Sequence, residues 1–318
     1  MTNSVVLVTG GAGFIGSHLV DALLANGDHV RVLDNLSTGS RRNIAGASSN
    51  VELIEGDIRD AAVCAAACLG VRVVYHLAAL GSVPRSMHDP LTTDAVNTRG
   101  TLNLLIAARD AGVARVVFSS SSSVYGDTEV LPKVESMRAA PRSPYAVSKL
   151  AGEEYCRAFY HAFQLETVVL RYFNVFGPRQ SAASEYAAVI PRFVSALLDG
   201  KPPTLYGDGL QSRDFTYVGN VVKANLLAGR AASAAGAVCN VACGEQVTVL
   251  QVLSEIAARL GVEPAPVFMP ARPGDVRHSR ADITIAQSLL GYEPETLFSA
   301  GMDRTMQSYL MQSPNAAP

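Results

Sequence analysis

The feature that most constrains this chain is the stretch VVLVTGGAGFIGSHLV at positions 5–20. A run of β-branched residues stops at Thr9, and an apolar pattern with helical spacing resumes a few positions later. Glycines between a strand and a helix allow a tight turn, a close approach of backbone to a ligand, and close packing of helix on strand. The free N–H groups of the helix N-terminus would face phosphates. We therefore expect a dinucleotide site at Gly10, Gly13, Phe14, Ile15 and Gly16.

Strands and helices alternate over the first part of the chain. Apolar runs predict strands at Val5–Thr9, His29–Asp34, Val51–Glu55, Val71–Leu77, Val113–Ser119 and Glu166–Arg171. Helical spacing predicts helices at Ile15–Asn26, Leu91–Ala111 and Pro144–Phe163. This alternation, with strands that are apolar on both faces, is typical of a doubly wound parallel sheet, the Rossmann arrangement of the α/β class.

The pattern loosens after about Gly177, where prolines become frequent. Helices are still expected there, at Val189–Leu198, Val218–Ala228, Val249–Leu260 and Ala281–Leu289. We expect residues 1–176 to form the dinucleotide-binding domain with the catalytic residues. Residues 177–318 would form mainly a smaller mixed α/β substrate lobe, with some segments returning to the first domain. The ligand would lie in the cleft between them.

Charge and cysteine content exclude several classes of protein. The formal net charge is −2 and the pI is near 6.3, which argues against nucleic acid or membrane as a partner. Five scattered cysteines without a secretory signal indicate a reducing cytoplasm. The pairs Cys64/Cys68 and Cys239/Cys243 have no histidine nearby, so we expect apolar core residues and no metal site.

Acidic residues at strand ends indicate which dinucleotide binds. Asp34 follows Gly16 by 18 positions, where a carboxylate can accept both ribose hydroxyls and repel a 2′-phosphate. NAD is therefore expected, although Arg41 and Arg42, seven positions later, could argue for NADP. Asp57 ends the third strand and could meet an adenine amino group, or else cap a helix beginning near Ile58.

Tyr145 and Lys149 lie four positions apart and would share one face of a helix. A neighbouring ammonium group and a positively charged cofactor ring would lower the pKa of the phenol and make it a usable base. The alternative is that Tyr145 and Lys149 are ordinary exposed residues on the surface of a helix. The serine run Ser119–Ser123 follows the fifth strand, at the sheet edge where ligands bind. His76, inside an apolar strand end, is expected to be a hydrogen-bonded structural residue.

Several motifs occur together in one order: GxxGxxG, YHLAA (75–79), SSSSSVYG (119–126) and YAVSK (145–149). Over essentially its whole length the chain resembles the extended short-chain dehydrogenase/reductase superfamily, and within it the NAD-dependent epimerase/dehydratase family. The resemblance implies catalysis by Ser121, Tyr145 and Lys149. It also implies cofactor contacts at Asp34, Asn35, Asp57, Ile58, Leu77, Ala78, Ala79, Asn97, Tyr145, Lys149, Tyr172 and Phe173.

The residues after Ser121 distinguish reactions within this family. Nucleotide-sugar dehydratases carry Asp-Glu there for the loss of water, and the related uronate decarboxylases keep the Glu. This chain has Ser122 and Ser123 instead. The resemblance therefore implies a 4-epimerase, which oxidises C4 of a nucleotide sugar, lets the keto-sugar turn, and returns the hydride to its other face.

The resemblance also implies a substrate site. Arg213 and Arg272 would hold the pyrophosphate, and the small Ser279 would leave room for an N-acetyl group. UDP-GlcNAc/UDP-GalNAc, and UDP-Glc/UDP-Gal with them or in their place, are the expected substrates. The implied substrate contacts are Ser82, Val83, Ser121, Ser122, Asn174, Ala188, Val189, Tyr206, Arg213, Arg272, Asp275 and Ser279.

Three alternatives stay open at this point. A UDP-glucuronate 4-epimerase could meet its carboxylate with Arg85 or Arg179. A nucleotide-sugar dehydratase or reductase is a second, and a non-enzymatic redox sensor that binds the dinucleotide is a third. Retention of the catalytic serine, tyrosine and lysine argues against the sensor. By analogy with relatives, helices 91–111 and 144–163 would form a homodimer interface.

Overall fold

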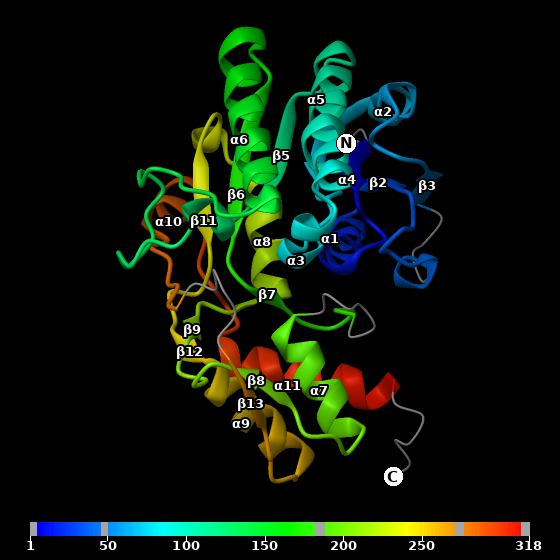
Figure 1. Cartoon of the computed structure of the whole chain (residues 1–318). Coiled ribbons are helices and arrows are strands. Elements are labelled where there is room, and N and C mark those ends of the chain that lie inside the picture. Colours follow the sequence, from blue (N-terminus) through cyan, green and yellow to red (C-terminus); the bar gives the residue numbers. More distant parts are fainter. Residues whose placement is uncertain (1–4, 46–49, 182–187, 271–276, 313–318) are drawn as a thin grey trace.

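The computed structural model describes residues 5–45, 50–181, 188–270 and 277–312. Its centre is a parallel sheet of seven strands in the order β11-β6-β5-β4-β1-β2-β3 (Figure 1). The strands are β1 (Val5–Thr9), β2 (His29–Asp34), β3 (Val51–Glu55), β4 (Val71–His76), β5 (Arg115–Ser121), β6 (Glu166–Tyr172) and β11 (Val238–Val241). The order reverses direction between β1 and β4, so the predicted doubly wound sheet is confirmed.

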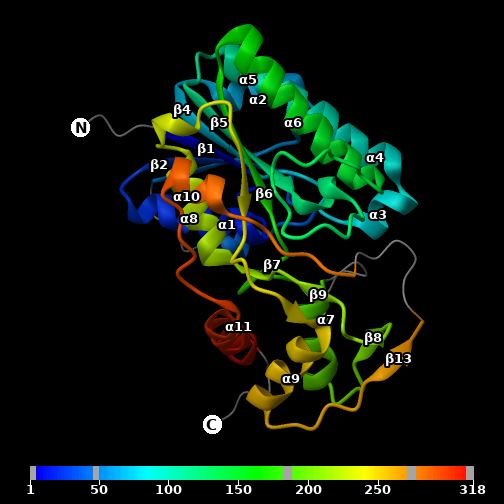
Figure 2. The same ribbon diagram turned by 90° about the vertical axis from the view of Figure 1, so that its left-hand side faces the viewer.

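Helices cover both faces of this sheet, as Figure 2 shows. One layer holds α1 (Phe14–Ala25), α8 (Val218–Ala228) and α10 (Thr284–Leu290). The other holds α2 (Ala61–Cys68), α5 (Gly100–Asp110) and α6 (Pro144–Phe163). Because neighbouring strand residues point to opposite faces, Val6 and Val8 pack under α1 while Leu7 packs under α2 and α5.

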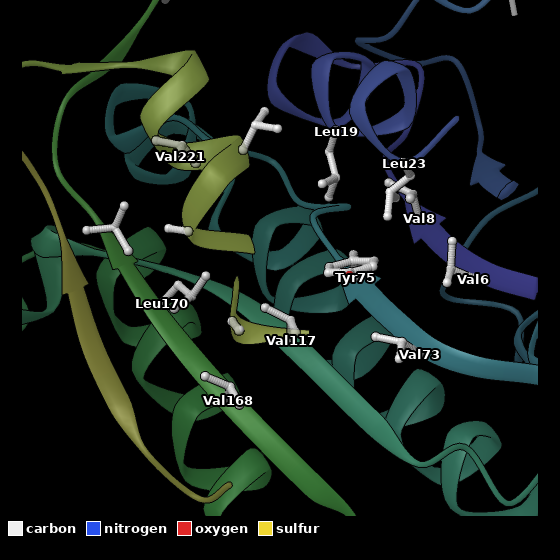
Figure 3. Close-up of a cluster of buried hydrophobic side chains, with 14 of the residues drawn as sticks. Val6, Val8, Leu19, Leu23, Val73, Tyr75, Val117, Val168, Leu170 and Val221 are labelled. Carbon is white, nitrogen blue, oxygen red and sulfur yellow. The ribbon is translucent and has the colours of Figure 1, made fainter. Parts of the chain in front are cut away.

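The core under α1 and α8 is drawn in Figure 3. Leu19 and Leu23 of α1 and Val221 of α8 point toward strand residues such as Val117 and Leu170. All five side chains are at most 1% exposed. Burying one such side chain contributes about 1.5–3 kcal/mol. This packing fixes the sheet whose edge carries the site.

Several predicted helices are confirmed at both ends. They are α6, α8, α7 (Val189–Leu198) and α9 (Val249–Leu260). At the start of α6 the Ser143 hydroxyl accepts a hydrogen bond from the backbone N–H of Ala146 at 3.2 Å, and Pro144 occupies the first turn. The N-terminal cap therefore determines where Tyr145 and Lys149 lie.

The predicted helix Leu91–Ala111 is wrong in its middle. The structure has α4 (Pro90–Asp94), then a π-helical turn over Ala95–Arg99, then α5. The wider turn carries Asn97, whose side chain bonds the backbone of Leu80. The predicted helix Ala281–Leu289 begins late, at Thr284, because Ala281 forms a β-bridge with Lys133.

Beyond β6 the structure contains elements that the sequence patterns did not predict. They are α11 (Phe298–Gln312) and the short strands β7 (Val175–Phe176), β8 (Thr204–Tyr206), β9 (Ser212–Arg213), β10 (Thr216–Tyr217), β12 (Val247–Thr248) and β13 (Val267–Met269). These strands form three separate pairs, β7–β10, β9–β12 and β8–β13. The lobe has its own core, in which the rings of Phe176, Phe215 and Phe298 meet.

All five cysteines are free, and all are buried. Cys64 and Cys68 belong to the core under α2 and α5, as expected, and burial raises the pKa of each to about 12. Within the described ranges no helix combines the length and the apolar character needed to cross a bilayer.

Candidate active site

One cavity of about 340 Å³ runs along the carboxyl edge of the sheet. Strand ends and the loops that follow them supply most of its lining, and α1, α6 and one residue of the π-helical turn supply the rest. We call it the sheet-edge cavity. Its lining residues are Gly10, Gly13, Phe14, Ile15, Gly16, Leu33, Asp34, Asn35, Ser37, Thr38, Gly56, Asp57, Ile58, Leu77, Ala78, Ala79, Leu80, Gly81, Val96, Ser119, Ser120, Tyr145, Lys149 and Tyr172.

The glycine turn follows β1, between the ends of β4 and β2, and lines the middle of the cavity. Gly10 has φ +69°, a conformation that favours glycine. A Cβ atom on Gly16 would lie 2.1 Å from the carbonyl oxygen of Gly10, so helix α1 packs directly on the turn. No described side chain caps the N-terminus of α1, and its first turn holds no acidic residue. The turn therefore fits a pyrophosphate placed against the helix N-terminus.

Asp34 lies at the end of β2 and is 7% exposed. Its two carboxylate oxygens accept hydrogen bonds from the backbone N–H groups of Ala12 at 2.9 Å and Leu36 at 2.8 Å. Each oxygen keeps a second lone pair, so the carboxylate can still accept ligand hydroxyls. Arg41 forms an ion pair with Glu55 and is not among the cavity-lining residues.

Asp57 lines the cavity beside Ile58. Its carboxylate pairs with the Arg59 guanidinium at 2.8 Å and accepts a hydrogen bond from the Asn35 side chain at 2.9 Å. The bonds from Arg59, with smaller help from Asn35, lower the pKa of Asp57 to about 2. The alternative that Asp57 caps a helix near Ile58 is wrong, because α2 begins at Ala61 and Asp60 caps it.

Tyr145 and Lys149 enter the far end of the cavity from α6. The Lys149 side chain is buried, and its amine donates to the Ser119 carbonyl oxygen at 2.7 Å. Burial lowers the pKa of Lys149 to about 8. Tyr145 is hydrogen-bonded to the side chain of Ser121. The structure thus brings the predicted serine, tyrosine and lysine together.

The expected lowering of the Tyr145 pKa by Lys149 is not found. Burial raises the pKa of Tyr145, and the hydrogen bond to Ser121 offsets this only in part. The Lys149 amine is engaged by the Ser119 carbonyl oxygen instead. The phenol therefore stays protonated at neutral pH until further positive charge enters the site.

The other predicted cofactor residues differ in whether they line the cavity. Tyr172 lines the cavity, and its hydroxyl bonds the side chains of Ser119 at 2.9 Å and Asn225 at 2.7 Å. Asn97 is 2% exposed and holds the backbone of Leu80, which does line the cavity. Phe173 is fully buried in a cluster with Tyr125 and does not line the cavity.

His76 is a structural residue, as expected. Its ring nitrogens bond the hydroxyls of Thr9 at 2.7 Å and Thr101 at 2.9 Å. Burial lowers the pKa of His76 to about 3, so the ring is neutral in the physiological range.

Some of the predicted substrate residues meet on the lobe side. Asn174 has φ +31°, and its amide donates to the backbone oxygen of Asp214 at 3.2 Å and approaches the Ser279 hydroxyl at 3.5 Å. The Arg213 guanidinium donates to two backbone oxygens, one of them that of Ser212 at 2.9 Å. These contacts place Asn174 and Ser279 side by side.

The remaining predicted substrate residues are more dispersed. Ser82 caps the short helix α3 (Val83–His88), and Ser122 lies in a 3₁₀ turn directly after β5. Ala188 and Val189 begin α7, and the Tyr206 ring lies 5.7 Å from the Arg192 guanidinium. Arg272 and Asp275 lie outside the described residues.

Sequence reasoning missed several residues that line the cavity. Ser37, Thr38 and Gly56 follow the ends of β2 and β3, so the rule that ligands bind beyond strand carboxyl ends could have found them. Val96 carries no such signal, because it enters from the π-helical turn.

Comparisons with known proteins agree with this geometry. Residues 6–242 match the NAD dependent epimerase/dehydratase family. A UDP-glucose 4-epimerase of Mycolicibacterium smegmatis is 41% identical over 96% of this chain and 99% of that protein. The structure of a UDP-N-acetylglucosamine 4-epimerase from Methanobrevibacter ruminantium, in complex with UDP-N-acetylmuramic acid, superposes with a TM-score of 0.94. It is 41% identical and covers 98% of this chain and all of that one.

A third relative carries the cofactor. The structure of a UDP-glucose 4-epimerase from Thermus thermophilus, in complex with NAD, has a TM-score of 0.89 and 38% identity over 97% of this chain and all of that one. The sheet-edge cavity, the glycine turn and the Ser121–Tyr145–Lys149 cluster are thus found in a chain that belongs to the NAD-dependent epimerase/dehydratase family.

Proposed function

We propose that this chain is an NAD-dependent 4-epimerase of UDP-sugars. The observation that carries the proposal is that Tyr145 and Lys149 line the same cavity as the glycine turn, while Ser121, which is not among the lining residues, is hydrogen-bonded to Tyr145. The high identity to 4-epimerases over nearly the full length of each chain supports it. Asp34, at the end of β2, would accept the adenosine ribose hydroxyls and select NAD.

Three side chains would carry the proton chemistry. Tyr145 takes the proton from the sugar hydroxyl at C4 and returns it, while the Ser121 hydroxyl bonds the same sugar oxygen. Lys149 supplies a positive charge one helical turn from Tyr145 and a donor for a ribose hydroxyl. NAD held in the sheet-edge cavity would supply the hydride acceptor for C4 and the donor that returns the hydride. Since burial raises the pKa of Tyr145, positive charge close to the phenol is needed for the phenolate to form.

The residues beside Ser121 favour epimerisation over dehydration. Ser122 and Ser123 occupy a 3₁₀ turn, and the backbone N–H of Ser123 bonds the Ser121 hydroxyl at 3.2 Å. A hydroxyl cannot act as the carboxylic acid or carboxylate that loss of water requires. The same argument disfavours uronate decarboxylation.

We further propose UDP-GlcNAc and UDP-GalNAc as substrates, with UDP-Glc and UDP-Gal also accepted. Ser279 supports this: it is a small residue, 8% exposed, close to the Asn174 amide. UDP-glucuronate stays the alternative. Of the two arginines that could meet its carboxylate, Arg179 forms an ion pair with Asp21 at 2.7 Å, which weakens that case.

The test is incubation of the purified protein with UDP-Glc, UDP-GlcNAc and UDP-GlcA in separate reactions, with the C4 epimers resolved by NMR. We expect the galacto epimer from the first two. Failure on all three would reject the function, and turnover of UDP-GlcA alone would select the alternative. Ser279→Tyr should suppress turnover of the N-acetyl sugar while UDP-Glc is still converted; unchanged UDP-GlcNAc turnover would reject the pocket argument.

We propose that two copies of the chain associate through helices α3, α4 and α6, which lie on one side of the central sheet. Leu91 on α4 is 83% exposed, Met87 on α3 is 64% exposed and Val147 on α6 is 53% exposed. Figure 2 shows these three helices on one side of the sheet. Val147→Glu should convert a dimer to a monomer in light scattering; a wild-type protein that is already monomeric at micromolar concentration would reject this.

We propose a cytoplasmic location, which the five free, buried cysteines support because none requires oxidation. We also propose the division into a cofactor domain, residues 1–176, and a substrate lobe beyond it. β11 and α8, which lie beyond residue 176, join the central sheet and its helix layer, in keeping with the returning segments.

A further inference from the structure

Glu153 is a buried carboxylate for which the proposed chemistry has no role. It follows Lys149 by four positions on α6, so both side chains lie on one face of the helix. Only 4% of Glu153 is exposed. One carboxylate oxygen accepts hydrogen bonds from the Ser120 hydroxyl and from the Arg171 Nε at 3.0 Å, and the other accepts from an Arg171 terminal nitrogen at 2.7 Å.

The partners of Glu153 adjoin residues of the site. Ser120 immediately precedes Ser121 at the end of β5, and it lines the sheet-edge cavity itself. Arg171 immediately precedes Tyr172 at the end of β6. A single carboxylate therefore joins the catalytic helix to the two strand ends that carry a catalytic serine and a cavity-lining tyrosine.

Stability is a weak reason for a chain to keep such a pair. Glu153 and Arg171 are 4% and 7% exposed, so both have lost their hydration. Replacing a buried ion pair by apolar residues of similar size is often neutral or stabilising. The pair is also bidentate, which restricts geometry more tightly than a single contact does. The partners of Glu153 at the two strand ends indicate a role in the site instead.

The charges around Lys149 show what that role is. On α6 the negative charge of Glu153 raises the pKa of Lys149 against the dominant effect of burial. His76 on β4 has a pKa lowered to about 3 by burial and is neutral, and burial raises the pKa of the Cys156 thiol on α6, so it is neutral too. Tyr145 on α6 is a protonated phenol.

Further charged and titratable groups lie around Glu153 and its partner Arg171. Arg171 on β6 is its charged partner, and the Tyr125 ring lies 4.8 Å from that guanidinium. Burial raises the pKa of Tyr125 to about 12, so it is uncharged. Glu135 meets Arg171 through its backbone oxygen. Of these groups, all within the described residues, Glu153 places a negative charge beside the Lys149 amine.

We propose that Glu153 is a positioning residue of the epimerase site: it holds the elements that carry Ser121, Lys149 and Tyr172 in one arrangement and keeps a negative charge beside the ammonium group of Lys149. This inference rests on the proposed function. Glu153 does not line the cavity and would act only through its neighbours.

The main test replaces Glu153 by glutamine, which keeps the shape and removes the charge. The matched control is Glu154→Gln, the same change one residue later, where the carboxylate is 53% exposed and pairs with Arg157 at the surface. Glu153→Gln should lower kcat by about tenfold to a hundredfold with KM for the UDP-sugar within about threefold, because the catalytic groups shift while the substrate contacts remain. Glu154→Gln should change neither.

A second readout does not depend on activity. The chain has four lysines, so ¹⁵N labelling of lysine with NMR titration can follow Lys149 directly. Glu153→Gln should lower the pKa of Lys149 by about one pH unit, since an opposite charge at short range is lost. The alkaline limb of the kcat profile should move to lower pH with it. Glu153→Asp, which keeps the charge but shortens the reach, should keep the pKa near the wild-type value while kcat falls.

A double variant separates positioning from folding. Glu153→Met with Arg171→Met removes both charges, so the protein should fold even where the single variant does not. We expect its kcat to stay low and the Lys149 pKa to stay depressed. Wild-type kcat in the double variant would overturn the inference, as would an unchanged Lys149 pKa in Glu153→Gln. A wild-type protein inactive on every UDP-sugar would instead defeat the proposed function, and this inference with it.

Discussion

The sheet-edge cavity and the C-terminal lobe hold their site residues in different ways. Around the cavity, most residues lie at or just beyond the ends of strands in one continuous parallel sheet, and neighbouring strands fix their positions. In the lobe, strands of two or three residues form isolated pairs, such as β9 with β12 and β8 with β13. The lobe must therefore join its segments by other means.

Asp214 is the clearest of those means. Its side chain is fully buried, and its carboxylate accepts hydrogen bonds from the backbone N–H groups of Cys243, Gly244 and Ala281 at 3.0–3.1 Å. Its own backbone oxygen accepts from Asn174. The Asp214 side chain thus connects three chain segments, and its backbone oxygen connects a fourth, without any sheet between them. The predicted cofactor residues are thus held by regular backbone pairing within one sheet. The predicted substrate residues of the lobe are held by individual side chains.

The largest effect should come from the end of the cavity where proton transfer is proposed. Tyr145→Phe removes the phenol but keeps the ring, so kcat for epimerisation should fall by about 10²–10⁴-fold while NAD still binds. The NMR assay measures turnover, and calorimetry measures NAD affinity. Tyr155→Phe, nearly three turns further along α6, serves as the control. Turnover retained by Tyr145→Phe would remove the basis of the mechanism.

The next largest effect tests the backbone principle at the glycine turn. A methyl group on Gly16 would lie 2.1 Å from the Gly10 carbonyl oxygen, so α1 must move away from the turn. We expect Gly16→Ala to lower the free energy of unfolding by about 1–3 kcal/mol and to weaken NAD binding. Gly81→Ala is the control for folding, because a Cβ there meets nothing within 4 Å. Equal denaturation midpoints for both variants would contradict the steric argument.

Asp214→Asn tests the side-chain principle in the lobe. An amide offers one acceptor atom where the carboxylate has two, so at least one buried N–H loses its partner, and the free energy of unfolding should fall by about 1–3 kcal/mol. The KM for the UDP-sugar should rise, because Ser279 precedes Ala281 closely. Asp208→Asn, at an exposed ion pair with Arg277 in the same lobe, should leave denaturation unchanged.

The Asp214 comparison also has a pH dependence. Burial raises the pKa of Asp214 to about 6, above its ordinary value of 3.8. The folded state therefore holds this proton more tightly, and the associated stability is present below about pH 4 and lost as the pH rises through about 6. The free energy of unfolding of Asp214→Asn should therefore come closer to that of the wild type as the pH rises from about 4 to about 6. A deficit independent of pH would contradict the assignment.

The same contrast explains what could be predicted from the sequence. Strand ends, helix caps and glycine spacing are local signals in the sequence. They correctly predict that Gly16, Asp34, Tyr145 and Lys149 line the cavity. A π-helical turn leaves no such signal: Asn97 and Val96 sit inside a stretch whose apolar spacing is that of an ordinary helix. That local pattern is why the helix over 91–111 was predicted unbroken.

Long-range pairings were beyond local reasoning. Ala281 was predicted to be helical, but it pairs with Lys133 some 150 positions earlier and bonds Asp214. Glu153 lies in the predicted helix, yet its role depends on Arg171 and Ser120, which only the folded sheet brings together. The resemblance implies cofactor contacts for both Tyr172 and Phe173, but Tyr172 lines the cavity whereas Phe173 is buried in a cluster with Tyr125.

A smaller effect is expected for cofactor selection at β2. Asp34→Asn keeps one oxygen for the backbone N–H groups of Ala12 and Leu36 and removes the charge that would repel a 2′-phosphate. NAD affinity relative to NADP should fall by about tenfold, equivalent to about 1.4 kcal/mol. Calorimetric titration with each dinucleotide measures the ratio. An unchanged ratio would mean that Asp34 serves the turn alone.

The smallest expected effect belongs to Arg41, which sequence reasoning could have assigned to NADP. Its guanidinium pairs with Glu55 across the end of the sheet, and its side chain is 63% exposed. Exposed ion pairs contribute little, so Arg41→Ala should leave the NAD/NADP affinity ratio within about twofold and the denaturation midpoint unchanged. Because Arg41 lies outside the cavity lining while Asp34 lies in it, the two variants compare a residue fixed by a strand end with one on the loop beyond it. A loss of NADP binding in Arg41→Ala would show that the loop, rather than the strand end, reads the ribose.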